Sequence, residues 1–125
     1  MIGICGMRSV RLARSLLLLL LAVFASAALA HHSWSRYDQT QPIGLSGTVV
    51  ELNFFNPHVT LTVQATGGTW LVVLGSPYRM QKLGLTSAAL KPGTKITVTG
   101  YPHRTEADTM RAERIVVDER TVNLR

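Results

Sequence analysis

Residues 59–74 read VTLTVQATGGTWLVVL, and this segment gives the clearest indication of the fold. Its first six residues alternate apolar with polar side chains, as expected of a β-strand buried on one face only. Gly67-Gly68 is typical of a hairpin turn. Residues 69–74 then form a second strand that is almost entirely apolar. The segment therefore predicts an antiparallel hairpin.

Upstream, the same alternation begins at Ile43 and predicts another strand, which Asn56-Pro57 ends in a turn. Its two predicted sides are Val50, Leu52 and Phe54 against Val49, Glu51 and Asn53.

Downstream, the period changes from two to that of a helix. Ser76 is a typical helix cap, Pro77 suits the first turn, and Gly84 suits the end. A short turn follows at residues 86–93, and alternation then resumes. The remaining strands are predicted at Lys95 to Tyr101, Met110 to Val117 and, after an Asp118-Glu119-Arg120 turn, Thr121 to Leu124.

Three strands, a helix and two strands are the order of an OB barrel. We therefore expect an all-β domain with one short helix, a small OB-like five-stranded antiparallel barrel of order β-β-β-α-β-β. An open antiparallel sheet covered by one helix fits the same pattern. The predicted organisation is a signal peptide at 1–30, an N-terminal arm at 31–42 and the barrel at 43–125.

Residues 1–30 have the layout of a cleaved secretory signal. Three arginines precede an apolar run from Leu16, and Ala28-x-Ala30 places small residues before a cut at His31. The 15 residues from Leu16 to Ala30 are short of the roughly 20 that span a bilayer. We expect an exported protein, periplasmic or secreted, without a stable membrane anchor after cleavage.

The charge balance and the cysteine count exclude several functions. The chain carries a net charge of +6, but residues 31–125 hold only 10 bases against 7 acids. The basic character therefore comes partly from the leader, and we expect no nucleic-acid partner. The single cysteine, Cys5, lies in the leader, which excludes a thiolate site in the exported protein. With no phosphate loop or hydrolase motif, the sequence favours a binding protein over an enzyme.

Four histidines provide a candidate metal site: His31, His32, His58 and His103. Cleavage before His31 would leave its amine and its imidazole able to chelate one ion together. A third nitrogen would complete a tetragonal site, which favours Cu(II). His31 and His58 are the favoured ligands. In the alternative interpretation the His-His arm is simply solvated, His58 is an exposed residue after a turn, and His103 is a surface histidine.

Several short motifs lie along the predicted exported part: His31-His32-Ser33-Trp34, Tyr37-Asp38, Phe55-Asn56-Pro57-His58, Gly75-Ser76-Pro77, Leu90-Lys91-Pro92-Gly93 and Val98-x-Gly100-Tyr101. Together they resemble a family of small exported bacterial proteins of unknown function, DUF6152. The resemblance spans the whole exported part and implies an OB-like domain without an established activity.

Three functional hypotheses follow. The first is an exported protein that binds Cu(II) through His31. The second is a metal-free module that binds a protein, an envelope polymer or a small ligand. The third, an oxidative copper enzyme, lacks any sequence feature for a substrate face or an electron donor.

Overall fold

The computed structural model describes residues 34–125, of which Arg36–Arg125 form one compact unit. The predicted signal peptide and the histidines at 31 and 32 lie outside the described residues. None of the helices in the described part is long and apolar enough to cross a membrane. The elements are β1 (Ile43–Asn53), β2 (Thr60–Ala65), β3 (Gly68–Val73), α2 (Pro77–Lys82), β4 (Lys95–Pro102), β5 (Thr109–Val117) and β6 (Arg120–Asn123).

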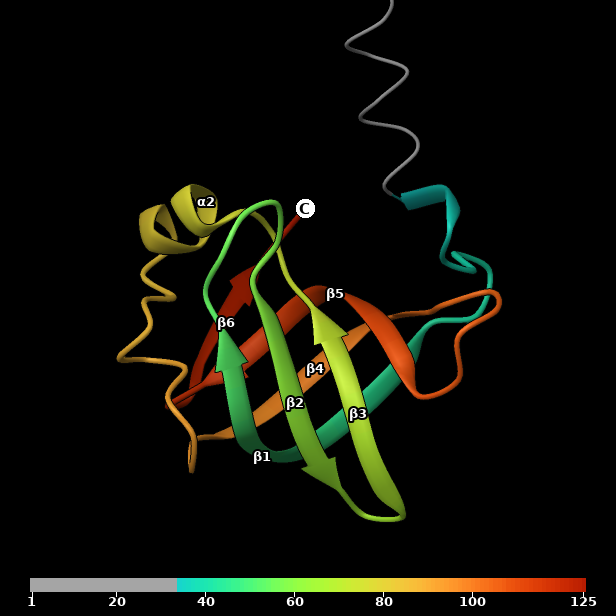
Figure 1. The fold of residues 1–125 in the computed structure, drawn as a ribbon, viewed down its shortest axis with the longest axis horizontal. Coiled ribbons are helices and arrows are strands. Elements are labelled where there is room, and N and C mark those ends of the chain that lie inside the picture. Colours follow the sequence, from blue (N-terminus) through green and yellow to red (C-terminus); the bar gives the residue numbers. More distant parts are fainter. Residues whose placement is uncertain (1–33) are drawn as a thin grey trace, which may run out of the picture. The chain divides into compact units, whose positions relative to one another are not determined.

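The strands form one sheet that closes on itself (Figure 1). The long strand β1 pairs through its first half with β4 and through its second half with β2. β2 continues to β3, and β4 continues to β5. β3 and β5 then meet along Leu71–Val73 and Thr109–Arg111. This closure confirms the OB-like five-stranded barrel and excludes the open sheet.

The prediction that the barrel is antiparallel was wrong at one pair, because β3 and β5 run parallel. Strand direction cannot alternate all the way around a closed ring with an odd number of strands. β2 and β4 both run opposite to β1, so β3 and β5 both run with β1 and must meet in parallel. β6 extends the sheet beyond the ring by pairing with the second half of β5.

The predicted sides of the first strand were also wrong in part, because β1 carries a bulge. Val49 pairs with Val63 and Glu51 with Thr62, so Val50 is an extra residue in the ladder. As a result Val49 is only 1% exposed and Val50 is 50% exposed, so Val50 does not share a side with Leu52 as predicted. After the bulge, Leu52 and Phe54 both pack against the core, on one side of the chain as predicted.

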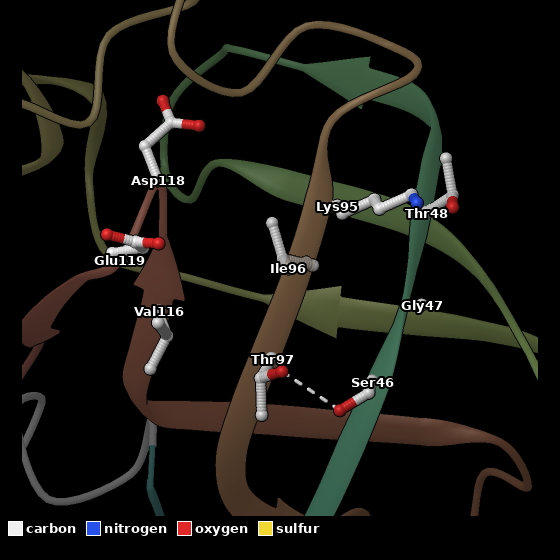
Figure 2. A pocket seen from close by; sticks show the side chains of 9 residues that line it. All are labelled: Ser46, Gly47, Thr48, Lys95, Ile96, Thr97, Val116, Asp118 and Glu119. Carbon is white, nitrogen blue, oxygen red and sulfur yellow. Dashed lines mark hydrogen bonds between the residues drawn. The ribbon is translucent and has the colours of Figure 1, made fainter.

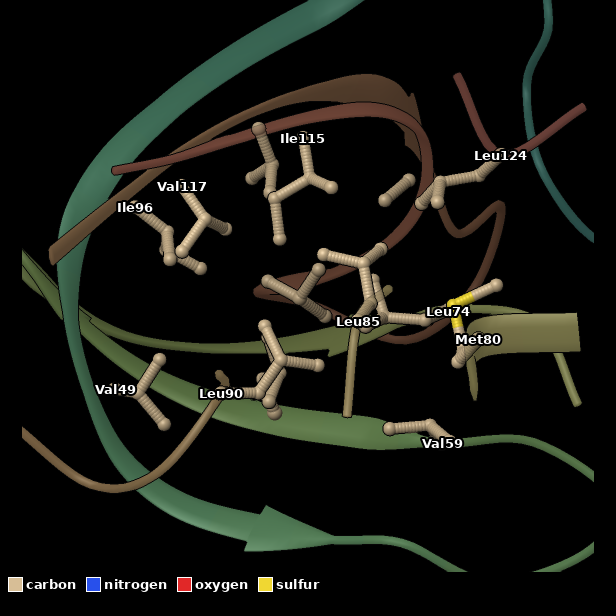
Figure 3. Close-up of a cluster of buried hydrophobic side chains, with 14 of the residues drawn as sticks. Val49, Val59, Leu74, Met80, Leu85, Leu90, Ile96, Ile115, Val117 and Leu124 are labelled. Atoms are coloured by element: carbon tan, nitrogen blue, oxygen red, sulfur yellow. The ribbon is translucent and has the colours of Figure 1, made fainter. Parts of the chain in front are cut away.

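The barrel encloses one apolar core, and α2 covers one end of it (Figure 3). Ser76 caps the helix by accepting a hydrogen bond from the backbone N–H of Arg79, with Pro77 in the first turn as predicted. Met80 points from α2 into the core, where it is fully buried. Gly84 ends the segment with φ +76, a conformation that favours glycine.

The arm runs beside the loop between β4 and β5. Tyr37 and His103 form an isolated antiparallel bridge. Two backbone hydrogen bonds flank the bridge, from Asp38 N to Pro102 O at 2.8 Å and from Arg104 N to Arg36 O at 2.9 Å. Tyr37 is 7% exposed, so this part of the arm is packed onto the barrel.

Candidate functional site

The turn between β1 and β2 holds one phenylalanine inward and presents the next to solvent. Phe54 packs against the core, whereas Phe55 is 71% exposed. The turn contains a cis peptide bond between Asn56 and Pro57. Val59 fixes its far end, because its N–H donates to Gly75 O and its carbonyl accepts from Leu74 N, both at 2.8 Å. The turn is therefore anchored at both ends, and its most prominent side chain is Phe55.

His58 stands on the same turn in a half-buried position. Burial lowers its pKa, and the positive charge of Arg111 lowers the pKa further. The imidazole is therefore neutral at neutral pH, as a metal ligand must be. The same Arg111 charge repels a bound cation. The surroundings of His58 therefore favour the neutral imidazole that a copper site needs, but they disfavour the positive charge of the ion itself.

The His103 side chain holds the loop after β4 in place through hydrogen bonds. Its Nδ1 accepts hydrogen bonds from the backbone N–H of Glu106 at 3.0 Å and of Thr105 at 3.2 Å. In the neutral ring, an accepting Nδ1 leaves the proton on Nε2. The ring also packs edge-on against Tyr37, with centroids 5.1 Å apart. Metal binding through either nitrogen would disturb this arrangement, so the interpretation of His103 as a loop residue fits the geometry better.

The described residues do not bring the predicted metal ligands together. Within residues 34–125, no three histidine, cysteine, aspartate or glutamate side chains form a group that could hold a metal ion. Because His31 and His32 lie outside the described residues, the copper site stays a prediction.

Sequence reasoning missed the buried charge of Arg111. It lies on β5 opposite Tyr101 on β4 and Val73 on β3, and it is only 8% exposed. Burial lowers its pKa, and the proximity of Tyr37 acts in the opposite direction. Burial likewise raises the pKa of Tyr37. The sequence did not predict this burial. The arm near Arg111 has no periodic pattern, so nothing in it indicated that it would cover the outer face of the strand.

Among the hollows on the described surface, two bear on a candidate site. The first, of about 580 Å³, runs over β1, β4 and the β5–β6 turn (Figure 2). The Ser46 and Thr97 hydroxyl groups are joined there by a hydrogen bond of 2.9 Å, and Asp118 and Glu119 stand at its edge. Its lining has hydroxyl groups and charges but no aromatic side chain. It lies on the outer face of the sheet and over the β5–β6 turn.

The second hollow, of about 370 Å³, lies between the arm and the β4–β5 loop. Its lining residues are Arg36, His103, Arg104, Thr105 and Glu106. Of these residues, the sequence predicts only His103 as a candidate ligand, because nothing in the sequence shows that residue 36 meets residue 104.

Comparison with protein families gives one match. The model of a family of unknown function, DUF6152, matches residues 18–111. No curated protein matches the chain.

Solved structures share the fold at low sequence identity. A mutant of TiaS lacking its ZRD, in complex with agmatine, is 16% identical with a TM-score of 0.50, over 70% of this chain and 27% of that one. The Stn1–Ten1 complex of S. pombe is 17% identical with a TM-score of 0.49, over 61% of this chain and 57% of that one. The chain thus spans 27% of the TiaS chain and 57% of the Stn1–Ten1 chain, and the similarity concerns the fold alone.

Proposed function

Because the chain belongs to DUF6152, a family of unknown function, we propose a function from the geometry alone. The protein is a small exported binding module that holds a partner protein through the β1–β2 turn and catalyses no reaction. The observation that carries this proposal is the 71% exposure of Phe55 on a turn anchored at both ends.

The anchored turn supports binding because it lowers the entropic cost of association. Phe54 is packed against the core, and Val59 is tied to residues 74 and 75, so little freedom is lost when Phe55 is covered. A rigid aromatic side chain is the typical centre of a protein interface, where it fills an apolar pocket of the partner. The expected partner therefore has an apolar pocket of aromatic size on its surface.

Photo-crosslinking in the export compartment tests this proposal. A photoreactive phenylalanine replaces Phe55 in one variant and Val50, which is 50% exposed on β1, in the control. We expect one adduct of defined mass from position 55 and none of that mass from position 50. Equal adducts from both positions, or no adduct from position 55, would contradict the proposal.

Copper binding is the second candidate, and the specific observation in its favour is the lowered pKa of His58. The neutral imidazole would serve as a further ligand for an ion held by the amine and ring of His31. The test is a Cu(II) titration followed by electron spin resonance on protein that begins at His31. A control form with one residue added before His31 should bind far more weakly, and equal affinity of the two forms would refute the copper site.

A further inference from the structure

We propose that the end of the barrel covered by α2 is a docking surface for an acidic partner protein, whose carboxylate groups surround its apolar pocket. The inference rests on the proposed function, because it extends the surface around Phe55 and states the charge of the partner. The surface consists of Phe55 on the β1–β2 turn and of Tyr78, Arg79 and Lys82 on α2, and we call it the α2 surface.

The two parts of the α2 surface leave the same hydrogen-bonded junction. Val59 N donates there to Gly75 O at 2.8 Å. Phe55 lies four residues before this junction and Tyr78 three residues after it. A Cβ at Gly75 would lie 3.5 Å from the Cδ atom of Arg79, so the Arg79 side chain passes along the junction. The β1–β2 turn and α2 therefore present their exposed side chains at one end of the barrel (Figure 1).

Tyr78 supplies a second exposed aromatic ring. It is 68% exposed, close to the 71% of Phe55. The Lys82 ammonium group stands over the Tyr78 ring, 5.0 Å from its centroid, and this contact holds the charge beside the ring. Arg79 is exposed on the same helix. Aromatic residues and arginine are enriched in protein interfaces, so α2 presents the side chains that such an interface uses.

The segments that build this end of the barrel carry bases and no acids. Between Glu51 and Glu106 the sequence holds no aspartate or glutamate, and this range includes the β1–β2 turn, α2 and the connection to β4. Within residues 34–125, no carboxylate forms an ion pair with Arg79 or Lys82. The positive charge of α2 is therefore available to a partner.

The negative groups at this end come from the C-terminal segment. The C-terminus lies there, since Leu124 packs into the core on the same side as Met80 (Figures 1 and 3). Glu113 accepts a hydrogen bond from the Tyr101 hydroxyl at 2.8 Å and pairs with Arg125, so its charge is already compensated. The C-terminal carboxylate offsets only part of the charge of the two bases on α2.

A protein fits the α2 surface better than a lipid bilayer does. A helix that lies in a membrane inserts an apolar face, but α2 has only six residues and buries its Met80 side chain in the core. Phe55 and Tyr78 are separate aromatic groups of the size that an interface pocket accepts. Complementary charges around such a pocket favour one partner over others. The partner is therefore expected to carry aspartate or glutamate side chains around the pocket.

Crosslinking from α2 tests the extent of the surface, with the photoreactive phenylalanine itself as the probe. The exported protein carries it at position 55, at position 78 or, as the control, at position 71, since Leu71 is 38% exposed on β3. After irradiation in an extract of the export compartment, we expect the same protein adduct from positions 55 and 78 and none of that mass from position 71. An adduct from position 55 that position 78 does not share would overturn the α2 surface and leave the proposed function standing. No adduct from position 55 would overturn both, and an adduct of lipid mass there would assign the surface to a membrane instead.

The yield of the adduct from position 55 tests the charge of the partner. Lys82→Glu should lower the yield about threefold, the scale of an exposed charge pair, and this loss should shrink when the salt is raised from about 0.05 M to about 0.5 M. Lys95→Glu is the matched control, because it reverses the charge of an exposed lysine on β4, and it should keep the yield within about twofold. An unchanged or higher yield with Lys82→Glu, an equal loss with Lys95→Glu, or a loss that persists at high salt would overturn the acidic partner.

Discussion

Because α2 packs over the end of the barrel, we expect the effects of substitutions at Gly75 and Met80 on stability to depend on each other. Met80 is fully buried, so Met80→Ala should lower the free energy of unfolding by about 3 kcal/mol. A Cβ at Gly75 would lie 2.7 Å from the Met80 Cε atom. Gly75→Ala alone should therefore cost about 1–2 kcal/mol through overpacking.

The double variant should lose less than the sum of the two single variants. Truncation of Met80 removes the overlap, and the new methyl group at position 75 fills part of the cavity. A coupling of about 1 kcal/mol is the usual scale for residues in contact. Urea unfolding followed by the fluorescence of Trp70, which packs against the core, measures each free energy.

Ile115→Ala supplies the control cycle. Ile115 is also fully buried, but the nearest atoms to a Cβ at position 75 belong to Met80 and Arg79. The losses of unfolding free energy caused by Gly75→Ala and by Ile115→Ala should therefore add in the double variant. If the losses caused by Gly75→Ala and Met80→Ala also add within about 0.3 kcal/mol, the packing of α2 against the β3–α2 junction is not as described.

Three further predictions concern the turns and the strand closure. Gly100→Ala should destabilise by about 3 kcal/mol in urea unfolding, because its Cβ would overlap the Arg111 carbonyl oxygen; a loss below about 1 kcal/mol would show that the strands can separate there. Glu119→Gly should stabilise by about 0.5–1 kcal/mol, because Glu119 has φ +63 in the β5–β6 turn, and an unchanged or lower melting temperature would contradict this reasoning. Burial and Arg111 lower the pKa of His58, so the unfolded chain binds this proton more tightly and stability should fall as the pH decreases below about 6.5. His58→Gln should flatten that dependence in melting experiments between about pH 7.5 and 5, and an unchanged slope would assign it to other groups.

Periodicity was enough to predict the strands and the helix. Alternation placed β2, β4 and β5, and the order of Ser76, Pro77 and Gly84 placed α2, because these signals depend on neighbouring residues only. The bulge at Val50 was not predictable in this way. It depends on which residues of β2 pair with β1, and a single extra residue reverses the sides on which its neighbours lie.

The candidate sites were predictable only in part. The turn with Phe55 and His58 was evident from Asn56-Pro57, but the exposure of Phe55 depends on which phenylalanine the core accepts. Nothing in the sequence predicted that Arg36 lies opposite Arg104, since this pairing arises from one isolated bridge between distant segments. Arg111 is buried for a similar reason, because its surroundings are set by closure of the barrel rather than by its own strand.

The most direct test of the proposed function is the affinity of the crosslinked partner, once purified, for three forms of the protein. Phe55→Ala should weaken binding at least tenfold relative to the unsubstituted protein, since truncation of a central aromatic anchor costs about 2 kcal/mol or more. Val50→Ala, at an exposed apolar position on β1, should stay within twofold. Equal affinities for all three forms would contradict the assignment of the β1–β2 turn as the binding surface.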